Sequence, residues 1–115
     1  MDIIYKNKNA KEQFCSNYNK KWKYPTNVAE ALRATELYIR AAASLQDIFN
    51  YPPFHFHPLK GNRKGEWSIR LKNTGYRITL VPCDVDGKAI LTGDILLLCK
   101  TIKIIMVTEV SNHYE

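Results

Sequence analysis

The sequence lacks the features of a membrane-spanning or exported protein. No segment approaches the run of about 20 apolar residues that crosses a bilayer, because Asp94, Lys100 and Lys103 interrupt the most apolar stretch, residues 89–107. The first eleven residues, MDIIYKNKNAK, do not show the order of a basic segment, an apolar stretch and a small-residue cleavage site that marks an export signal. We therefore expect a cytoplasmic protein without a membrane partner.

Cysteine is scarce, and several catalytic motifs are missing. Cys15, Cys83 and Cys99 are odd in number and widely spaced, which is typical of free thiols in a reducing compartment. The sequence contains neither a glycine-rich phosphate loop of the Walker type nor a serine nucleophile elbow. Two histidines, His55 and His57, alternate onto one strand face, but no carboxylate or cysteine lies nearby at ligand spacing. We predict no metal site and no cofactor.

Acidic residues are few. The 115 residues include 11 acidic and 17 basic side chains, which gives a formal net charge of +6. This excess favours an acidic partner, of which nucleic acid is the commonest, although a membrane surface or an acidic protein is also compatible with it. With 45% hydrophobic residues the composition is that of a globular protein. The length predicts one domain, residues 1–115.

The first half of the chain predicts helices after a short strand. Residues 1–5 could form that strand, and residues 7–24 read as a weak helix followed by a basic loop. A better helix begins where Asn27 can act as N-cap with Glu30 three residues later. It fades towards Asn50, because the prolines after Tyr51 stop a helix. Its apolar stripe consists of Val28, Ala31, Leu32, Thr35, Tyr38, Ile39, Ala42 and Leu45.

The second half of the chain predicts strands. Residues 54–59 alternate, residues 61–65 (GNRKG) form a basic loop, and residues 82–94 read as an irregular excursion. Residues 101–110 are nearly continuously apolar, which indicates an interior strand covered on both faces. Residues 67–71 and 76–80 form a hairpin if residues 72–75 make a four-residue turn.

The predicted register sets two arginines side by side. Arg70 faces Arg77 in this hairpin, together with Ser68 facing Thr79, on the side that we expect to lie in solvent. The other side carries Trp67, Ile69, Leu71, Tyr76, Ile78 and Leu80. Like charges opposite each other on a sheet are destabilising. A phosphate held between the two guanidinium groups would offset the repulsion, as would acidic neighbours.

Basic residues are concentrated around this hairpin. Between residues 55 and 77 the only acid is Glu66, whereas the basic residues are Lys60, Arg63, Lys64, Arg70, Lys72 and Arg77. Histidine, lysine, arginine and tyrosine around a phosphodiester can cleave RNA without a metal. In that chemistry one group accepts the 2′-hydroxyl proton, cations stabilise the phosphorane, and another group protonates the leaving 5′-oxygen. A solvated basic surface without catalysis is the alternative interpretation.

Residues 57–82, HPLKGNRKGEWSIRLKNTGYRITLVP, closely resemble HigB-type toxins of the RelE/ParE superfamily, from bacterial type II toxin–antitoxin systems. The family pattern is an HPLKG-like stretch, a short basic turn with glycine, a strand that ends in arginine, and a YR strand. The likeness covers roughly residues 27–115. The parts that match the pattern are His57–Gly61, Gly65, Trp67–Arg70 and Tyr76–Arg77.

This resemblance implies an α+β, RelE-like fold with N-terminal helices packed on a small twisted antiparallel β-sheet. It implies a ribosome-dependent endoribonuclease that cleaves mRNA, neutralised by a HigA-like helix-turn-helix antitoxin. His113 is the leading acid/base candidate, but HigB toxins commonly end with an acid, a tyrosine and a histidine in that order. Because Asn112 precedes His113 and Tyr114 here, either of those two could occupy the catalytic position. The other implied catalytic residues are His57, Lys60, Arg70 and Arg77, and the RNA-binding ones are Arg63, Lys64 and Lys72.

Two other functions stay open. ParE-like proteins share the implied architecture but inhibit DNA gyrase by binding it, and they need no acid/base groups. A degenerate relative could bind RNA without cleaving it, and this binding would be sensitive to salt.

Overall fold

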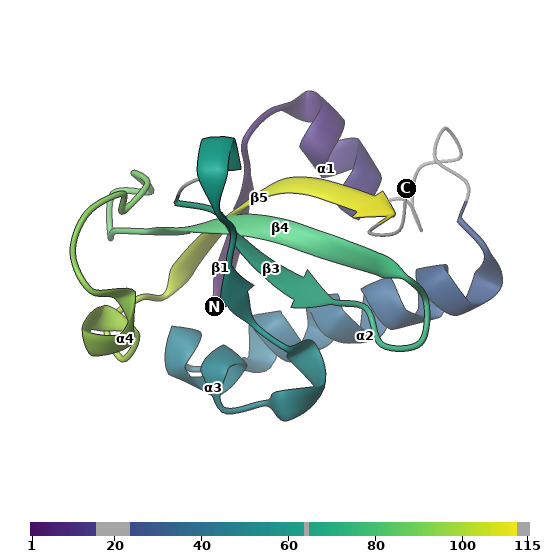
Figure 1. The fold of residues 1–115 in the computed structure, drawn as a ribbon, viewed down its shortest axis with the longest axis horizontal. Coiled ribbons are helices and arrows are strands. Elements are labelled where there is room, and N and C mark those ends of the chain that lie inside the picture. The colour runs from purple at the N-terminus through teal and green to yellow at the C-terminus, as the bar shows by residue number, and fades with distance from the viewer. Residues whose placement is uncertain (16–23, 64, 113–115) are drawn as a thin grey trace.

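The computed structural model describes residues 1–15, 24–63 and 65–112, and their helices pack against a five-stranded sheet (Figure 1). The strands are β1 (Asp2–Tyr5), β2 (His57–Pro58), β3 (Trp67–Arg70), β4 (Tyr76–Cys83) and β5 (Ile104–Asn112). The α-helices are α1 (Lys8–Phe14), α2 (Thr26–Ala41), α3 (Leu45–Phe49) and α4 (Ile95–Leu98), and the 3₁₀ segments are η2 (Pro52–Phe54) and η3 (Gly61–Arg63). The α+β class predicted from the sequence is confirmed.

The sheet is mixed, with the strand order β1-β5-β4-β3-β2. Neighbours from β2 to β5 are antiparallel, but β1 pairs with β5 in parallel, with Asp2 opposite Ile104. The expectation of an antiparallel sheet is therefore wrong at this edge. Parallel neighbours require a long crossover, and the chain between β1 and β5 contains all the helices and the other three strands. Pairing with β1 is a long-range contact that the local pattern of residues 1–5 does not encode.

Helix α2 differs from its predicted boundaries. It begins at Thr26, because the amides of Val28 and Ala29 both donate to the carbonyl of Pro25. Asn27 therefore lies inside the first turn and is not the N-cap. The helix ends at Ala41, and the chain turns towards the sheet through a hydrogen bond from the amide of Leu45 to the carbonyl of Ile102. The single helix predicted up to Asn50 is thus two helices, α2 and α3.

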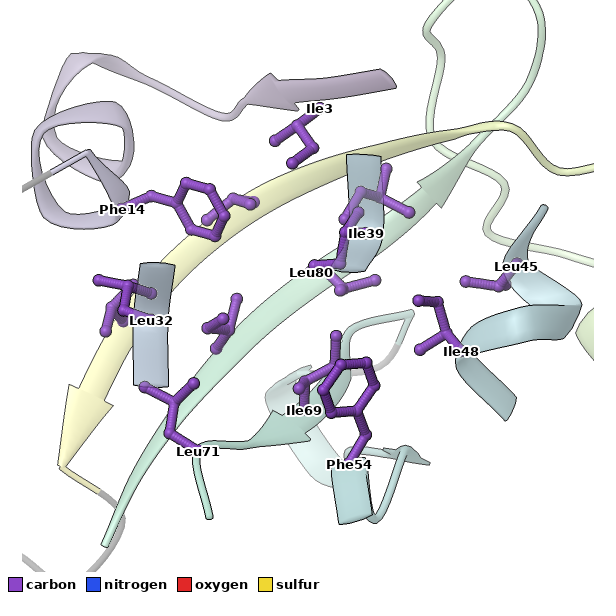
Figure 2. Packing of buried hydrophobic residues seen from close by; sticks show 14 of the residues in the cluster. Ile3, Phe14, Leu32, Ile39, Leu45, Ile48, Phe54, Ile69, Leu71 and Leu80 are labelled. Atoms are coloured by element: carbon purple, nitrogen blue, oxygen red, sulfur yellow. The ribbon is translucent and has the colours of Figure 1, made fainter. Parts of the chain in front are cut away.

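One hydrophobic cluster lies between the sheet and the helices (Figure 2). Leu32 and Ile39 of α2 and Phe14 of α1 point towards β4 and β5, while Ile48 and Phe54 approach β3. The apolar face predicted for the hairpin is confirmed, since this cluster includes Ile69, Leu71, Ile78 and Leu80, with Trp67 and Tyr76 packed at its margin.

The hairpin register also agrees with the prediction. Trp67 pairs with Leu80, Ile69 with Ile78, and Arg70 with Arg77. The turn is closed by hydrogen bonds from the amide of Leu71 to the carbonyl of Tyr76 and from the amide of Thr74 to the carbonyl of Leu71. Asn73, with φ 63°, occupies the left-handed conformation that asparagine tolerates in turns. The four-residue turn therefore sets which residues share a face.

The remaining strand predictions are confirmed only in part. β5 lies between β1 and β4, as expected for an interior strand, but only its helix-facing residues Ile105, Val107 and Val110 are buried. The opposite face carries partly exposed side chains such as Ile104 and Met106. Where β1 ends, α1 runs beside β5, and the side chain of Gln13 accepts a hydrogen bond from the amide of Val110. This contact protects an otherwise open sheet edge.

No helix in the described parts of the chain combines the length and hydropathy that crossing a bilayer requires.

Candidate functional site

A cleft of about 610 Å³ lies at the hairpin end of the sheet, and Ser68, Arg70 and Arg77 of its lining belong to the sheet face opposite the helices. We call this side of the sheet the arginine face, because it carries Arg70 and Arg77. Both arginines line the cleft. The full lining consists of His55, His57, Ser68, Arg70, Leu71, Lys72, Asn73, Gly75, Tyr76 and Arg77.

The two arginines point into the same space without acidic partners. Arg70 is exposed, and its Nη2 donates a long hydrogen bond of 3.4 Å to the carbonyl of Pro53. Arg77 is half-buried, and its Nε is fully buried without a hydrogen-bond partner. Within the described residues no carboxylate pairs with either guanidinium. A buried, unpartnered donor costs free energy.

The backbone around His55 orients the ring of His57. His55 has φ 43° and ψ 49°, a left-handed conformation that costs a non-glycine residue free energy. Its carbonyl lies 2.7 Å from Nδ1 of His57. Because a carbonyl oxygen only accepts hydrogen bonds, Nδ1 is the donor in this contact. The two imidazole rings meet edge to face, 4.8 Å apart.

Beside the cleft, a polar network fixes the loop of residues 61–66 to the sheet. Arg63 binds both carboxylate oxygens of Glu66, at 2.9 and 3.1 Å, and Oε1 of Glu109 at 3.1 Å. It also donates a 3.3 Å hydrogen bond to Oγ1 of Thr79. Thr108 completes the network by donating to Oε1 of Glu66 at 2.6 Å. This network accounts for the burial of Thr79, which is 0% exposed although its side was predicted to lie in solvent.

A β-bulge makes the network possible. Thr79 pairs with Glu109 while its neighbour Leu80 pairs with Val107, so Thr108 is the additional residue on β5. The hydroxyl of Thr108 lies 2.8 Å from that of Thr79, and Glu109 reaches Arg63 from the same strand. Two consecutive side chains of β5 thus act on the arginine face, which regular alternation would forbid. The sequence prediction did not include this bulge.

Glu66 gives the network a pH dependence. The hydrogen bonds from Arg63, and after them that from Thr108, hold the pKa of Glu66 below its usual value of 4.5. At pH values near and below 4.5, Glu66 of the folded protein therefore binds fewer protons than Glu66 of the unfolded chain. The stabilisation is fully present above pH 4.5 and is lost as the pH falls through the lowered pKa.

Replacing Glu66 with glutamine is expected to lower the free energy of unfolding at pH 7. The loss should be smaller in acid, where Glu66 itself becomes protonated. Urea unfolding of the parent and of Glu66→Gln between pH 7 and pH 3 measures this, and the gap between the two unfolding free energies should narrow below pH 4.5. Glu30→Gln, which removes an exposed carboxylate on α2, is the matched control. A gap that stays constant down to pH 3 would contradict this assignment.

The structure brings together some of the predicted site residues and separates others. His57, Arg70, Lys72 and Arg77 all line the cleft. Lys60 is exposed and does not contribute to the lining, and Arg63 is engaged by Glu66 and Glu109. The predicted residues Lys64, His113 and Tyr114 lie outside the described residues.

The end of β5 reaches the same site. Asn112, the last described residue, pairs with Tyr76, and Ser111 pairs with Arg77. Sequence reasoning missed Tyr76, Ser68 and His55 as parts of the cleft. Tyr76 was missed because the hairpin register puts it on the face opposite Arg77, whereas Ser68 could have been found from that register, since it shares a face with Arg70. His55 has no such signal, since its position depends on the left-handed turn after η2.

The described residues contain no group of three or more histidine, cysteine or acidic side chains that could hold a metal. In comparisons with known proteins, no family model matches the sequence and no curated protein matches it significantly. We therefore infer the function from the geometry of the cleft and from the resemblance within residues 57–82.

Proposed function

We propose that this chain is a toxin of the HigB type with a RelE-like fold, which cleaves mRNA on the ribosome by metal-independent acid/base chemistry. The observation that carries the proposal is the pair Arg70 and Arg77, directly opposite each other and both lining one cleft. Within residues 1–15, 24–63 and 65–112 no carboxylate pairs with either guanidinium, and Nε of Arg77 is buried without a partner. Paired guanidinium groups with free donors suit a phosphodiester.

The proposed reaction assigns a role to each group at the cleft. A general base takes the proton of the 2′-hydroxyl, and the 2′-oxygen forms a bond to phosphorus. Arg70 and Arg77 stabilise the additional negative charge of the phosphorane. The bond from phosphorus to the 5′-oxygen then breaks, and a general acid gives that oxygen a proton. The products are a 2′,3′-cyclic phosphate and a 5′-hydroxyl.

His57 suits the base role, because its Nδ1 is held by the carbonyl of His55 and its Nε2 is free to accept a proton. His113 and Tyr114 are the candidates for the other proton transfer. They follow Asn112 in the sequence, and Asn112 is paired with Tyr76 of the cleft. Lys72, which also lines the cleft, adds positive charge for the flanking backbone.

The partners that we propose are an mRNA in the ribosome and an HigA-like helix-turn-helix antitoxin. The formal net charge of +6 suits a polyanionic target. An acidic segment of the antitoxin could occupy the same cleft as the RNA, because both would be held by Arg70 and Arg77.

Purified protein added to ribosomes programmed with a defined mRNA tests the proposal directly. Cleavage should be seen by primer extension only when ribosomes are present, and the new ends should carry a 2′,3′-cyclic phosphate and a 5′-hydroxyl. Chelation of divalent cations after the ribosomal complex has formed and been crosslinked should not stop cleavage. In cells, induction of the protein should shorten specific transcripts within minutes.

Other outcomes would favour the two alternative functions. DNA breaks with intact transcripts would indicate a ParE-like inhibitor of DNA gyrase. Salt-sensitive binding of RNA without any cleavage on ribosomes would indicate a degenerate relative that keeps the cationic cleft but not the chemistry.

A further inference from the structure

A second hollow adjoins the cleft, between α2 and the η2 segment. Its volume is about 180 Å³, which corresponds to roughly six water molecules at about 30 Å³ each. The small side chains Ala31, Ala34 and Thr35 of α2 form one wall. The opposite wall consists of Tyr51, Pro53 and Phe54, and the lining is completed by Tyr38, Arg70 and Lys72. We call this hollow the aromatic groove.

The aromatic side chains of the groove form a rigid platform. Tyr38 and Tyr51 stack with ring centroids 4.6 Å apart, and Phe54 meets both rings edge to face, at 5.0 Å from Tyr38 and 4.7 Å from Tyr51. The hydroxyl of Tyr38 donates to the carbonyl of Asp47 at 3.3 Å. Tyr51 remains 37% exposed although it belongs to this packed cluster. Its orientation is thus fixed before any ligand binds.

The groove and the cleft share their cations. Arg70 and Lys72 are the two residues that line both spaces. The hydrogen bond from Nη2 of Arg70 to the carbonyl of Pro53 holds the guanidinium at the boundary, because Pro53 itself lines the groove. An apolar slot with positive charge at its mouth is therefore continuous with the candidate phosphate site.

We propose that the aromatic groove binds a nucleobase of the RNA strand, from a nucleotide that flanks the phosphodiester in the cleft. This inference rests on the proposed function. A nucleotide joins a planar, weakly polar ring to an anion, and the groove joins an aromatic surface to Arg70 and Lys72 in the same order. Stacking on tyrosine and cationic contact to the backbone are the usual means of holding single-stranded nucleic acid.

An acidic peptide is the competing occupant, since an apolar side chain next to a carboxylate has similar chemistry. The observations favour RNA because the groove is small and opens directly into the larger cleft of about 610 Å³, where two arginines lie opposite each other. Each nucleotide of an RNA strand carries one base and one phosphate. A single nucleotide unit can therefore place its base in the groove and its phosphate in the cleft.

Binding of a short single-stranded RNA with 2′-O-methyl groups, which prevent cleavage, tests the proposal by fluorescence anisotropy. Tyr51→Leu, which removes the ring and keeps the apolar bulk, should weaken binding roughly 5- to 100-fold. Tyr51→Phe keeps the ring and should bind like the parent. A second arm compares the parent protein and Tyr51→Leu on oligonucleotides that carry one abasic residue. One abasic position should weaken binding to a similar extent, and at that position Tyr51→Leu should cause no further loss.

The outcomes separate this inference from the proposed function. If Tyr51→Leu binds like the parent while Arg77→Ala binds weakly, the base site is wrong and the phosphate site stands. If the oligonucleotide does not bind to the parent protein, the base site is wrong, whereas the cleavage assay on ribosomes still decides the proposed function; if Arg77→Ala leaves the affinity for the oligonucleotide unchanged, both proposals fail. If Tyr51→Leu loses binding to an acidic peptide but binds RNA like the parent, the groove belongs to a protein partner and the inference is overturned.

Discussion

Arg77→Ala is expected to lower the rate of mRNA cleavage on ribosomes by roughly 10²–10³-fold, because removal of one preorganised charge contact to the transition state typically costs that much. Arg77 faces Arg70 across the hairpin and lines the cleft with its Nε buried and unpartnered. Its loss breaks no ion pair with a carboxylate of the described chain. The folded state should therefore persist, and growth arrest on expression should be relieved.

Two further variants show whether the lower cleavage rate of Arg77→Ala comes from the lost geometry of the guanidinium or from the change in net charge. Arg77→Lys keeps the charge but loses the planar pair of donors, so it should recover only part of the activity. Lys100→Ala removes one positive charge at an exposed position that does not line the cleft, and it should cleave at the parental rate. Single-turnover cleavage gives the rate of each variant, and melting curves show whether each variant is folded. A folded Arg77→Ala protein as active as the parent would refute the catalytic site.

Ile78→Ala, one residue further along β4, is expected to lower the stability of the protein and to leave the cleavage rate nearly unchanged. Ile78 is 0% exposed in the cluster between sheet and helices, paired with Ile69 on β3 and Val110 on β5. Truncation to alanine leaves a cavity that these neighbours cannot close, and it should cost about 2–5 kcal/mol. Since small domains are stable by only about 5–15 kcal/mol, the variant should melt roughly 10 °C or more below the parent.

Urea unfolding of Ile78→Ala measures this loss, with Val85→Ala as the control, since Val85 is 88% exposed and its truncation should change stability by no more than about 0.5 kcal/mol. Well below its melting temperature, Ile78→Ala should still cleave mRNA at close to the parental rate. Unfolding curves identical to those of the parent would show that the helix-facing side of β4 is not packed as described. Substitutions of the adjacent β4 residues Arg77 and Ile78 are thus expected to lower activity and stability, respectively.

The hairpin was predictable because its determinants are local. Alternation of apolar and polar residues sets the faces, and the length of the turn over residues 72–75 sets the register. These two features were sufficient to place Arg70 opposite Arg77 and Ile69 opposite Ile78. They did not indicate that Ser68 and Thr79 are buried, because the residues that cover Thr79, led by Arg63, come from a different part of the chain.

The helix boundaries were predicted less well, for a related reason. The capping pattern at Asn27 and Glu30 is a local signal, but Pro25 already accepts the first amides of α2. After α2 ends at Ala41, the amide of Leu45 at the start of α3 donates to the distant carbonyl of Ile102. Sequence patterns identified the apolar stripe of α2 from Val28 to Ile39, but Ala42 and Leu45, which were predicted to continue it, lie beyond the end of α2.

The sequence by itself determined the α+β class, the hairpin register and the presence of cations on one side of it, since each depends on residues close together in the chain. Tertiary contacts set which of these cations have carboxylate partners. The bulge at Thr108 lets Glu109 join Glu66, a near neighbour in the chain, at the guanidinium of Arg63, whereas no carboxylate of the described residues pairs with Arg70 or Arg77. Pairing of this kind joins residues more than forty positions apart, and no local pattern encodes such contacts.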